Sequence, residues 1–197
     1  MRFIRGPIPP SETFDPAAAG WNALRAADSR RFTIVALFCT IPFLLAATAL
    51  FFRAAPSLRP IFHEHLWSLL VFLLLLLLLV PAHELIHAIA YRCRFRSRQL
   101  WIGIWPERAM AYVLYDVPLP RRRVLGMLVA PFLVLTVLPM VVASFLSSPW
   151  SLCAGFFALL HAALCVGDAA TIQRLLRQVP AGARIHNHGW QLYWAHH

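Results

Sequence analysis

Two histidines and a glutamate close a long apolar stretch of this sequence. The run VFLLLLLLLV ends at Val80, and the chain continues PAHELIHAIA to Ala90. Within it, His83, Glu84 and His87 form the pattern His-Glu-x-x-His. Polar and ionisable side chains are costly at membrane depth, so their presence there indicates a functional site.

The spacing of this motif suits a metal ion held on a helix. Residues four apart differ by about 40° around a helix, so the imidazoles of His83 and His87 can converge on one zinc ion. Glu84 is turned by about 100° from His83, where it can hold a water that zinc activates. The alternative is a pair of core histidines with a carboxylate partner that packs helices together.

Asp168 is the predicted third ligand, because a catalytic zinc usually has three from the protein. Three acidic residues follow His87, and the other two lie in a loop region. Asp168 and His83 come at similar distances from the starts of their apolar segments, which places both near the same membrane depth. The alternative is an interfacial carboxylate paired with an arginine such as Arg174.

His161 shares a helix face with Asp168, two turns earlier. That spacing places it about 10 Å deeper in the membrane, too far to bind the same zinc. His161 could contact substrate or an oxyanion, or it could be a core histidine bonded to a neighbouring helix. Cys165 is a remote candidate for a fourth ligand. Three histidine pairs are predicted on the surface: His63/His65, His186/His188 and His196/His197.

Composition indicates a membrane protein. The 197 residues are 60% hydrophobic and 13% charged, whereas about a quarter of the residues of a soluble domain are charged. Four segments reach the roughly 20 apolar residues that cross a bilayer: 32–52, 66–90, 124–146 and 150–176. The remaining pieces are too short for a core of their own. We therefore expect one membrane domain over residues 32–176, with an N-terminal segment 1–31 and a tail 177–197.

The basic residues follow the loops. All 18 are arginines, and 16 lie in residues 1–31, in residues 92–123 or from Arg174 onward. The other two are Arg53 and Arg59. The positive-inside rule then predicts that both termini and the central loop lie in the cytoplasm. A nucleic-acid partner is not expected, because that would place the charge on one folded face.

The predicted fold is an all-α membrane protein with four transmembrane helices and a cytoplasmic β-hairpin between the second and third. The hairpin covers residues 99–116, which are rich in aromatic and branched residues around the turn Pro-Glu-Arg. An irregular interfacial loop is the alternative. In the N-terminal segment, FDPAAAGWNALRAADSRR predicts a short juxtamembrane helix capped by Asp15.

Four pieces of the chain carry a family resemblance: HELIH, the hairpin, PRRRVLGMLVAPF and HAALCVGDAATI. Together they resemble the bacterial membrane family of zincin peptidases, which is similar to the site-2 intramembrane metalloproteases. The resemblance covers most of the chain, and it implies an integral protein of the bacterial inner membrane. It implies that His83, His87 and Asp168 bind zinc and that Glu84 is the catalytic acid and base. It also implies that the hairpin offers an edge strand to an extended substrate. Relatives tend to have an asparagine where this chain has His161.

The predicted function is a membrane-embedded, zinc-dependent hydrolase. We expect an endopeptidase that uses one zinc ion and cleaves a protein or peptide substrate near the cytoplasmic face of the bilayer. Two other classes stay open: a non-catalytic metal-binding scaffold or transporter, and a di-iron lipid hydroxylase or desaturase. A transporter would be expected to show repeated halves, and a di-iron enzyme would be expected to show more histidine clusters in the cytoplasmic loops.

Overall fold

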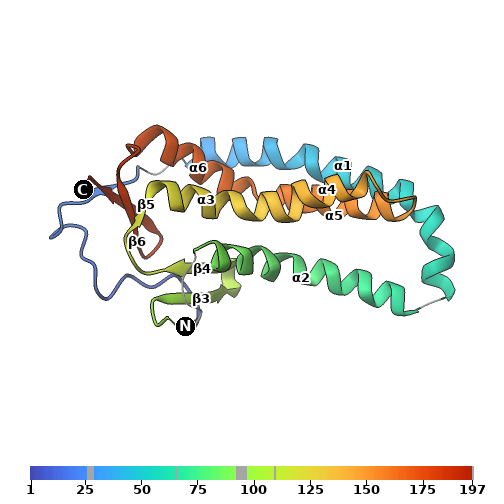
Figure 1. Cartoon of the computed structure of the whole chain (residues 1–197), viewed down its shortest axis with the longest axis horizontal. Coiled ribbons are helices and arrows are strands. Elements are labelled where there is room, and N and C mark those ends of the chain that lie inside the picture. The colour runs from blue at the N-terminus through green and yellow to red at the C-terminus, as the bar shows by residue number, and fades with distance from the viewer. Residues whose placement is uncertain (26–28, 65, 92–96, 109, 197) are drawn as a thin grey trace. The chain divides into compact units, whose positions relative to one another are not determined.

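The computed structural model describes residues 1–25, 29–64, 66–91, 97–108 and 110–196 (Figure 1). Helices make up more than half of the structure. The described residues form seven strands in two sheets, so the prediction of an all-α protein is wrong. The predicted hairpin supplies only two of these strands, and the others come mainly from the two terminal segments.

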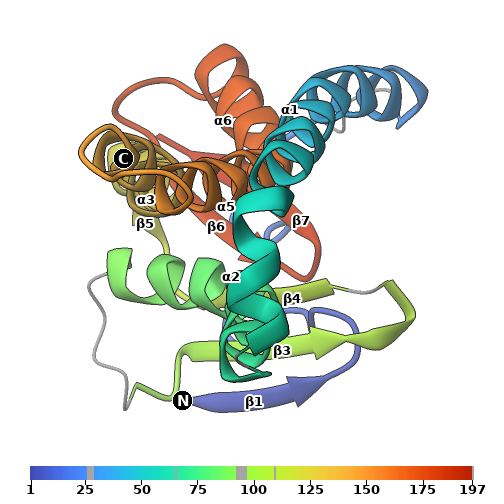
Figure 2. The same cartoon turned by 90° about the vertical axis from the view of Figure 1, so that its right-hand side faces the viewer.

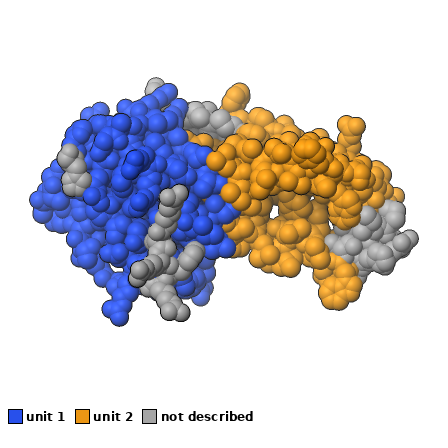
Figure 3. Space-filling view, viewed as in Figure 1, with its two compact units in different colours: residues 1–28, 84–130, 170–197 blue, residues 29–83, 131–169 orange. Residues whose placement is uncertain are grey.

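The chain divides into two compact units, coloured separately in Figure 3. Unit 1 comprises Met1–Asp28, Glu84–Ala130 and Ala170–His197, and unit 2 comprises Ser29–His83 and Pro131–Ala169. Unit 1 contains both sheets, and unit 2 is helical. The division falls inside the His-Glu-x-x-His motif: His83 belongs to unit 2, whereas Glu84 and His87 belong to unit 1.

Unit 2 is built from apolar helices. It holds α1 (Ser29–Glu64), most of α2 (Leu66–Ala90), the π-helix η2 (Leu133–Val137), α4 (Leu138–Ala143), α5 (Trp150–Leu164) and the start of α6 (Val166–Gln178). Gly155 lets α5 approach α1 closely, since a Cβ there would lie 3.2 Å from Leu50. Phe72 of α2 stacks on Phe156 of α5, with ring centroids 6.0 Å apart.

Three helical stretches among the described residues are long and apolar enough to cross a membrane: Thr40–Arg59, Leu69–Ala90 and Arg121–Ala143. A fourth is possible if α5 and α6 count as one span, although the pair is bent by 47°. These stretches are compatible with a membrane protein. The predicted third span is one run of α3 (Arg121–Phe132), η2 and α4, whereas the predicted fourth span is broken at Cys165.

The first sheet of unit 1 has the order β1-β3-β4 (Figure 2). β3 (Leu100–Trp105) and β4 (Met110–Tyr115) are antiparallel and joined by η1 (Pro106–Arg108), which is the expected hairpin. β1 (Arg2–Arg5) pairs in parallel with β3. Gly103 lies under the Tyr112 ring, and the Tyr112 hydroxyl donates to the carbonyl of Gly6 at 3.3 Å. The N-terminal strand therefore occupies one edge of the hairpin, and β4 forms the other edge of this sheet.

The second sheet has the order β2-β7-β6-β5. Its strands are β2 (Asn22–Ala23), β5 (Leu119–Pro120), β6 (Arg184–His188) and β7 (Gln191–Ala195). β6 and β7 form a hairpin whose turn contains Gly189 at φ 58°, a conformation that glycine adopts without steric cost. The predicted tail 177–197 is thus largely a folded hairpin.

The N-terminal segment also differs from the prediction. Asp15 does accept bonds from the amides of Ala17 and Ala18, but residues 16–20 form turns and not a helix. Gly20, at φ 66°, ends these turns, and β2 then pairs with β7. Long-range strand pairing therefore overrides the local helix signal of this segment. Residues 26–28 of the predicted helix lie outside the described residues.

One apolar core joins the second sheet of unit 1 to its helices. Leu175 of α6 and Ile185 of β6 are almost fully buried in it, and so are Tyr91 beyond α2 and Met127 of α3. This packing holds the last turn of α2, which carries His87, against α3.

Candidate functional site

His83 and Asp168 are in direct contact within unit 2. The Nε2 atom of His83 on α2 lies 3.2 Å from Oδ2 of Asp168, which is in the first turn of α6. Both side chains are largely buried, with 10% and 17% of their surface exposed. A carboxylate therefore faces the imidazole nitrogen that a metal ion would use.

The distance between these two atoms fits zinc. Ligand atoms at 2.0–2.2 Å from a tetrahedral zinc lie roughly 3.3 Å from each other. The observed 3.2 Å between Nε2 of His83 and Oδ2 of Asp168 matches this value without rearrangement. Imidazole nitrogen and carboxylate oxygen are also common zinc ligands. The donor set and its spacing therefore fit the metal.

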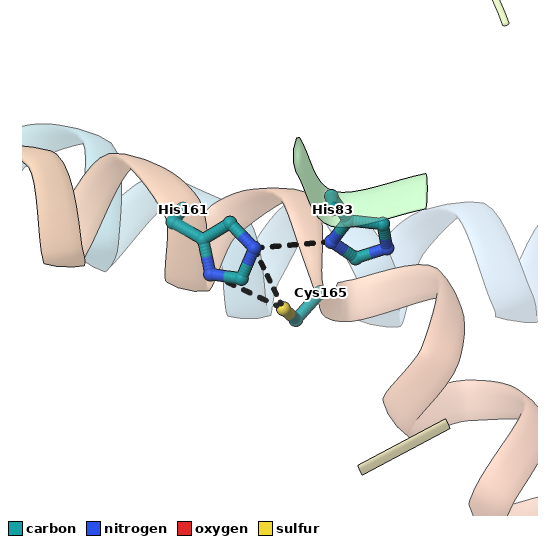
Figure 4. A group of neighbouring side chains, drawn as sticks. All are labelled: His83, His161 and Cys165. Carbon is teal, nitrogen blue, oxygen red and sulfur yellow. Dashed lines mark hydrogen bonds between the residues drawn. The ribbon is translucent and has the colours of Figure 1, made fainter. Parts of the chain in front are cut away.

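The second ring nitrogen of His83 meets another histidine. Its Nδ1 lies 3.0 Å from Nε2 of His161, and Nδ1 of His161 lies 2.8 Å from Oγ1 of Thr136. Figure 4 shows His161 and Cys165 beside His83. The ligand atoms of these three residues all lie within 4.8 Å of one another. They are therefore a group able to hold a metal ion, as an alternative to the pair of His83 and Asp168.

His87 is oriented within unit 1 by a backbone carbonyl. Its Nδ1 lies 3.0 Å from the carbonyl oxygen of Met127 on α3. Four residues later comes Pro131, which has no N–H and cannot make the usual helix bond to that oxygen. The proline thus leaves an acceptor that His87 uses. Because Nδ1 is bonded to this oxygen, Nε2 is the ring nitrogen of His87 that would bind a metal.

The motif lies on one unbroken helix. α2 runs from Leu66 to Ala90 and includes Pro81. His83 and His87 are buried and Glu84 is half-buried, whereas Leu85 and Ile89 are half or more exposed. The helical period therefore places both histidines on the buried side of α2.

The structure brings some predicted site residues together and adds others. Asp168 contacts His83, as the equal-depth argument expects. His161 is bonded directly to His83, although spacing on one straight helix placed it about 10 Å away from the zinc level. The break between α5 and α6 separates His161 from Asp168 onto two helices, so straight-helix spacing does not apply. Sequence reasoning missed Thr136 and the Met127 carbonyl. The sequence signal for the carbonyl is Pro131, which lacks the N–H that would bond to it in a regular helix.

One of the predicted surface histidines is not on the surface. His186 in β6 is 3% exposed, and its Nε2 lies 3.2 Å from Oδ1 of Asp116. Burial lowers the pKa of His186 below its usual value, and the Asp116 carboxylate offsets only part of that effect. His188 is half-buried and His196 is exposed. The side chains of the remaining pair members, at positions 63, 65 and 197, lie outside the described residues.

One known protein family matches more than half of this chain. Residues 76–184 match the family described as "Putative zincin peptidase", and the chain belongs to this family. That description supports a zinc peptidase in general. No curated protein and no solved structure is similar enough to the chain to count as a match.

Proposed function

We propose that this chain is a membrane-embedded zinc endopeptidase in which His83, His87 and Asp168 hold the metal and Glu84 is the catalytic base. The observation that carries the proposal is the contact between Nε2 of His83 and Oδ2 of Asp168. It joins the His-Glu-x-x-His helix to a carboxylate remote in sequence, at a separation suited to zinc. His87 follows one turn after His83 on the same helix, so its imidazole can reach the same ion.

The chemistry divides between the metal and Glu84. Zinc, when bound, polarises a carbonyl oxygen and lowers the pKa of water. Glu84, between the two histidines, takes the proton of the attacking water and delivers it to the leaving amine. Asp168 adds a negative charge that offsets the charge of the metal in a poorly solvated region. His83 and His87 keep fixed orientations through the partners of their Nδ1 atoms.

A bilayer setting is supported by the surface of the helices. Large apolar side chains are exposed along α2, including Leu73, Leu77 and Leu85. Contiguous exposed apolar surface of this kind marks a membrane or protein interface. The asymmetric distribution of arginines supports both termini and the hairpin on the cytoplasmic side, with cleavage near that face.

The substrate would be a protein or peptide with an extended segment. Extended peptides can add a strand to an exposed sheet edge. β1 already lies along β3, so we assign the substrate strand to the β4 side of the sheet.

Replacement of Glu84 by glutamine tests the proposal. The variant keeps the size of the side chain but removes the base, so zinc content should stay near one ion per chain. Peptidase activity should fall by about 10² to 10⁴-fold. The substrate is identified first, by cross-linking membranes that contain the Glu84→Gln protein and recovering proteins that this variant retains.

The matched control is Glu107→Gln, the same change at an exposed residue of the hairpin turn. It should retain both zinc and activity. Full turnover by Glu84→Gln would show that Glu84 is not the base. Loss of zinc in Glu84→Gln, with no turnover by the unmodified protein, would favour a non-catalytic metal scaffold.

A further inference from the structure

Among the polar side chains of unit 2 that the structure describes, His161 is the most deeply buried, with 0% of its surface exposed. Both of its ring nitrogens have hydrogen-bond partners at short distances. Nε2 lies 3.0 Å from Nδ1 of His83, and Nδ1 lies 2.8 Å from Oγ1 of Thr136. A buried imidazole with a hydrogen bond on each nitrogen is held in one orientation, and it restricts the orientation of the side chains bonded to it.

A metal on His83 would determine which nitrogens of His83 and His161 carry a proton. This argument rests on the proposed function, in which Nε2 of His83 is a zinc ligand. A neutral imidazole that binds metal through Nε2 carries its proton on Nδ1. Nδ1 of His83 then donates to Nε2 of His161, and Nδ1 of His161 donates to the hydroxyl oxygen of Thr136. Every contact in the series pairs one donor with one acceptor.

We propose that His161 and Thr136 are positioning residues that fix the tautomer and ring orientation of His83 for zinc. Outer partners of this kind raise the basicity of the ligand and prevent its ring from turning. His87 has the same arrangement with a backbone carbonyl as its partner. The two motif histidines therefore both have a fixed acceptor for Nδ1, one supplied by a side chain and one by the main chain.

Local backbone structure accounts for the position of Thr136. It lies in the π-helix Leu133–Val137, where the amide of Leu138 bonds to the carbonyl of Leu133, five residues earlier. The extra residue in this turn shifts the side chains that follow relative to a regular helix. Thr136 is 8% exposed, as a polar residue bonded inside the unit should be. π-Helical turns often occur at functional sites.

An alternative to this positioning role is that His83, His161 and Cys165 bind a metal ion themselves. The sulfur of Cys165 lies 3.6 Å from Nδ1 and 3.8 Å from Nε2 of His161. These nearly equal distances show that the sulfur favours neither lone-pair direction. Both nitrogens also have closer partners, at 3.0 Å and 2.8 Å, than the sulfur, whose two contacts are drawn as dashed lines in Figure 4.

Zinc affinity, measured by competition with a chelator on purified protein, tests this proposal. His161→Phe keeps a ring but has no acceptor, so affinity should fall by roughly 10- to 100-fold. His161→Gln offers one acceptor and one donor and should restore most of it. Thr136→Val should weaken binding less than His161→Phe, and Thr136→Ser should restore it. Melting curves of the metal-free variants identify any that fail to fold. If a His161 variant fails, the comparison of Thr136→Val with Thr136→Ser tests the positioning role instead.

Two further arms separate the possible failures. His83→Ala should abolish zinc binding, and retention of zinc by that variant would mean that the proposed zinc site itself is wrong. If His83→Ala loses zinc but both His161→Phe and Thr136→Val bind it normally, the positioning role is wrong. In the cobalt-substituted protein, a thiolate-to-cobalt absorption band that Cys165→Ser removes would assign the metal to Cys165 and overturn the proposal.

Discussion

Each unit contains a buried histidine that touches an aspartate at the same distance. Nε2 of His83 is 3.2 Å from Asp168 in unit 2, and Nε2 of His186 is 3.2 Å from Asp116 in unit 1. The difference lies at the other nitrogen. Nδ1 of His83 is bonded to His161, whereas within the described part of the chain Nδ1 of His186 has no hydrogen-bond partner.

The surroundings of His186 are aromatic. The ring of Phe14 packs on it at 4.2 Å between centroids, and Trp21 lies 6.2 Å away. Among the described residues, the groups that could hold a metal include His83 but not His186. A His–Asp contact therefore indicates a metal centre only where further ligand groups lie beside it, as the His-Glu-x-x-His helix provides for His83. Further ligands and a fixed acceptor for the second nitrogen make the distinction.

The same substitution in both pairs gives the largest expected difference. Asp168→Asn removes the charge of a proposed ligand, so zinc affinity should fall by more than the roughly 10- to 100-fold typical of an outer partner. Asp116→Asn should leave zinc content unchanged and lower the free energy of unfolding by about 1 kcal/mol. Elemental analysis and melting curves measure the two effects. Equal zinc loss in both variants would remove the distinction between the pairs.

A smaller effect is expected at the acceptor of His87. Pro131→Ala supplies an N–H that competes with His87 for the Met127 carbonyl. The oxygen has two lone pairs, so both donors can bond in part. We expect zinc affinity to fall by up to about 10-fold, at the low end of the effect of an outer partner. Pro56→Ala, at an exposed position inside α1, is the control and should bind zinc normally. An unchanged affinity in Pro131→Ala would show that the missing N–H is unimportant.

The smallest effect concerns pH and His186. Burial lowers the pKa of His186 in the folded state, so the unfolded state binds its proton first as pH falls. The stability that the neutral ring contributes is complete above the usual histidine pKa of about 6.5 and is lost progressively below it. His186→Gln removes this titration. The difference in melting temperature between the unmodified protein and this variant should narrow from pH 7.5 to pH 5.5.

The exposed residue His196 provides the control for that measurement. His196→Gln should melt in parallel with the unmodified protein across the same range. A constant gap between His186→Gln and the unmodified protein would mean that His186 is not held neutral by burial.

The sequence by itself determined the features that depend on near neighbours. The His-Glu-x-x-His spacing required only a helix, and α2 is continuous through it. The hairpin of β3 and β4 followed from two strand-like runs around a short turn. The long apolar stretches were visible as composition, and three of them are helices long enough to span a bilayer. These features are local, because the hydrophobic periodicity of a helix or a strand is visible within a few residues.

Tertiary structure decided the features that depend on distant residues. β1 joins β3 across about a hundred residues, and β2 joins β7 across more. No local pattern records such pairings, so the terminal segments were predicted as a helix and a tail. The same holds at the site. The break at Cys165 places His161 and Asp168 on different helices, and His161 is bonded both to His83 and to Thr136 of the π-helix. Straight-helix spacing cannot predict this, because a bend changes which residues meet while leaving the sequence separation the same.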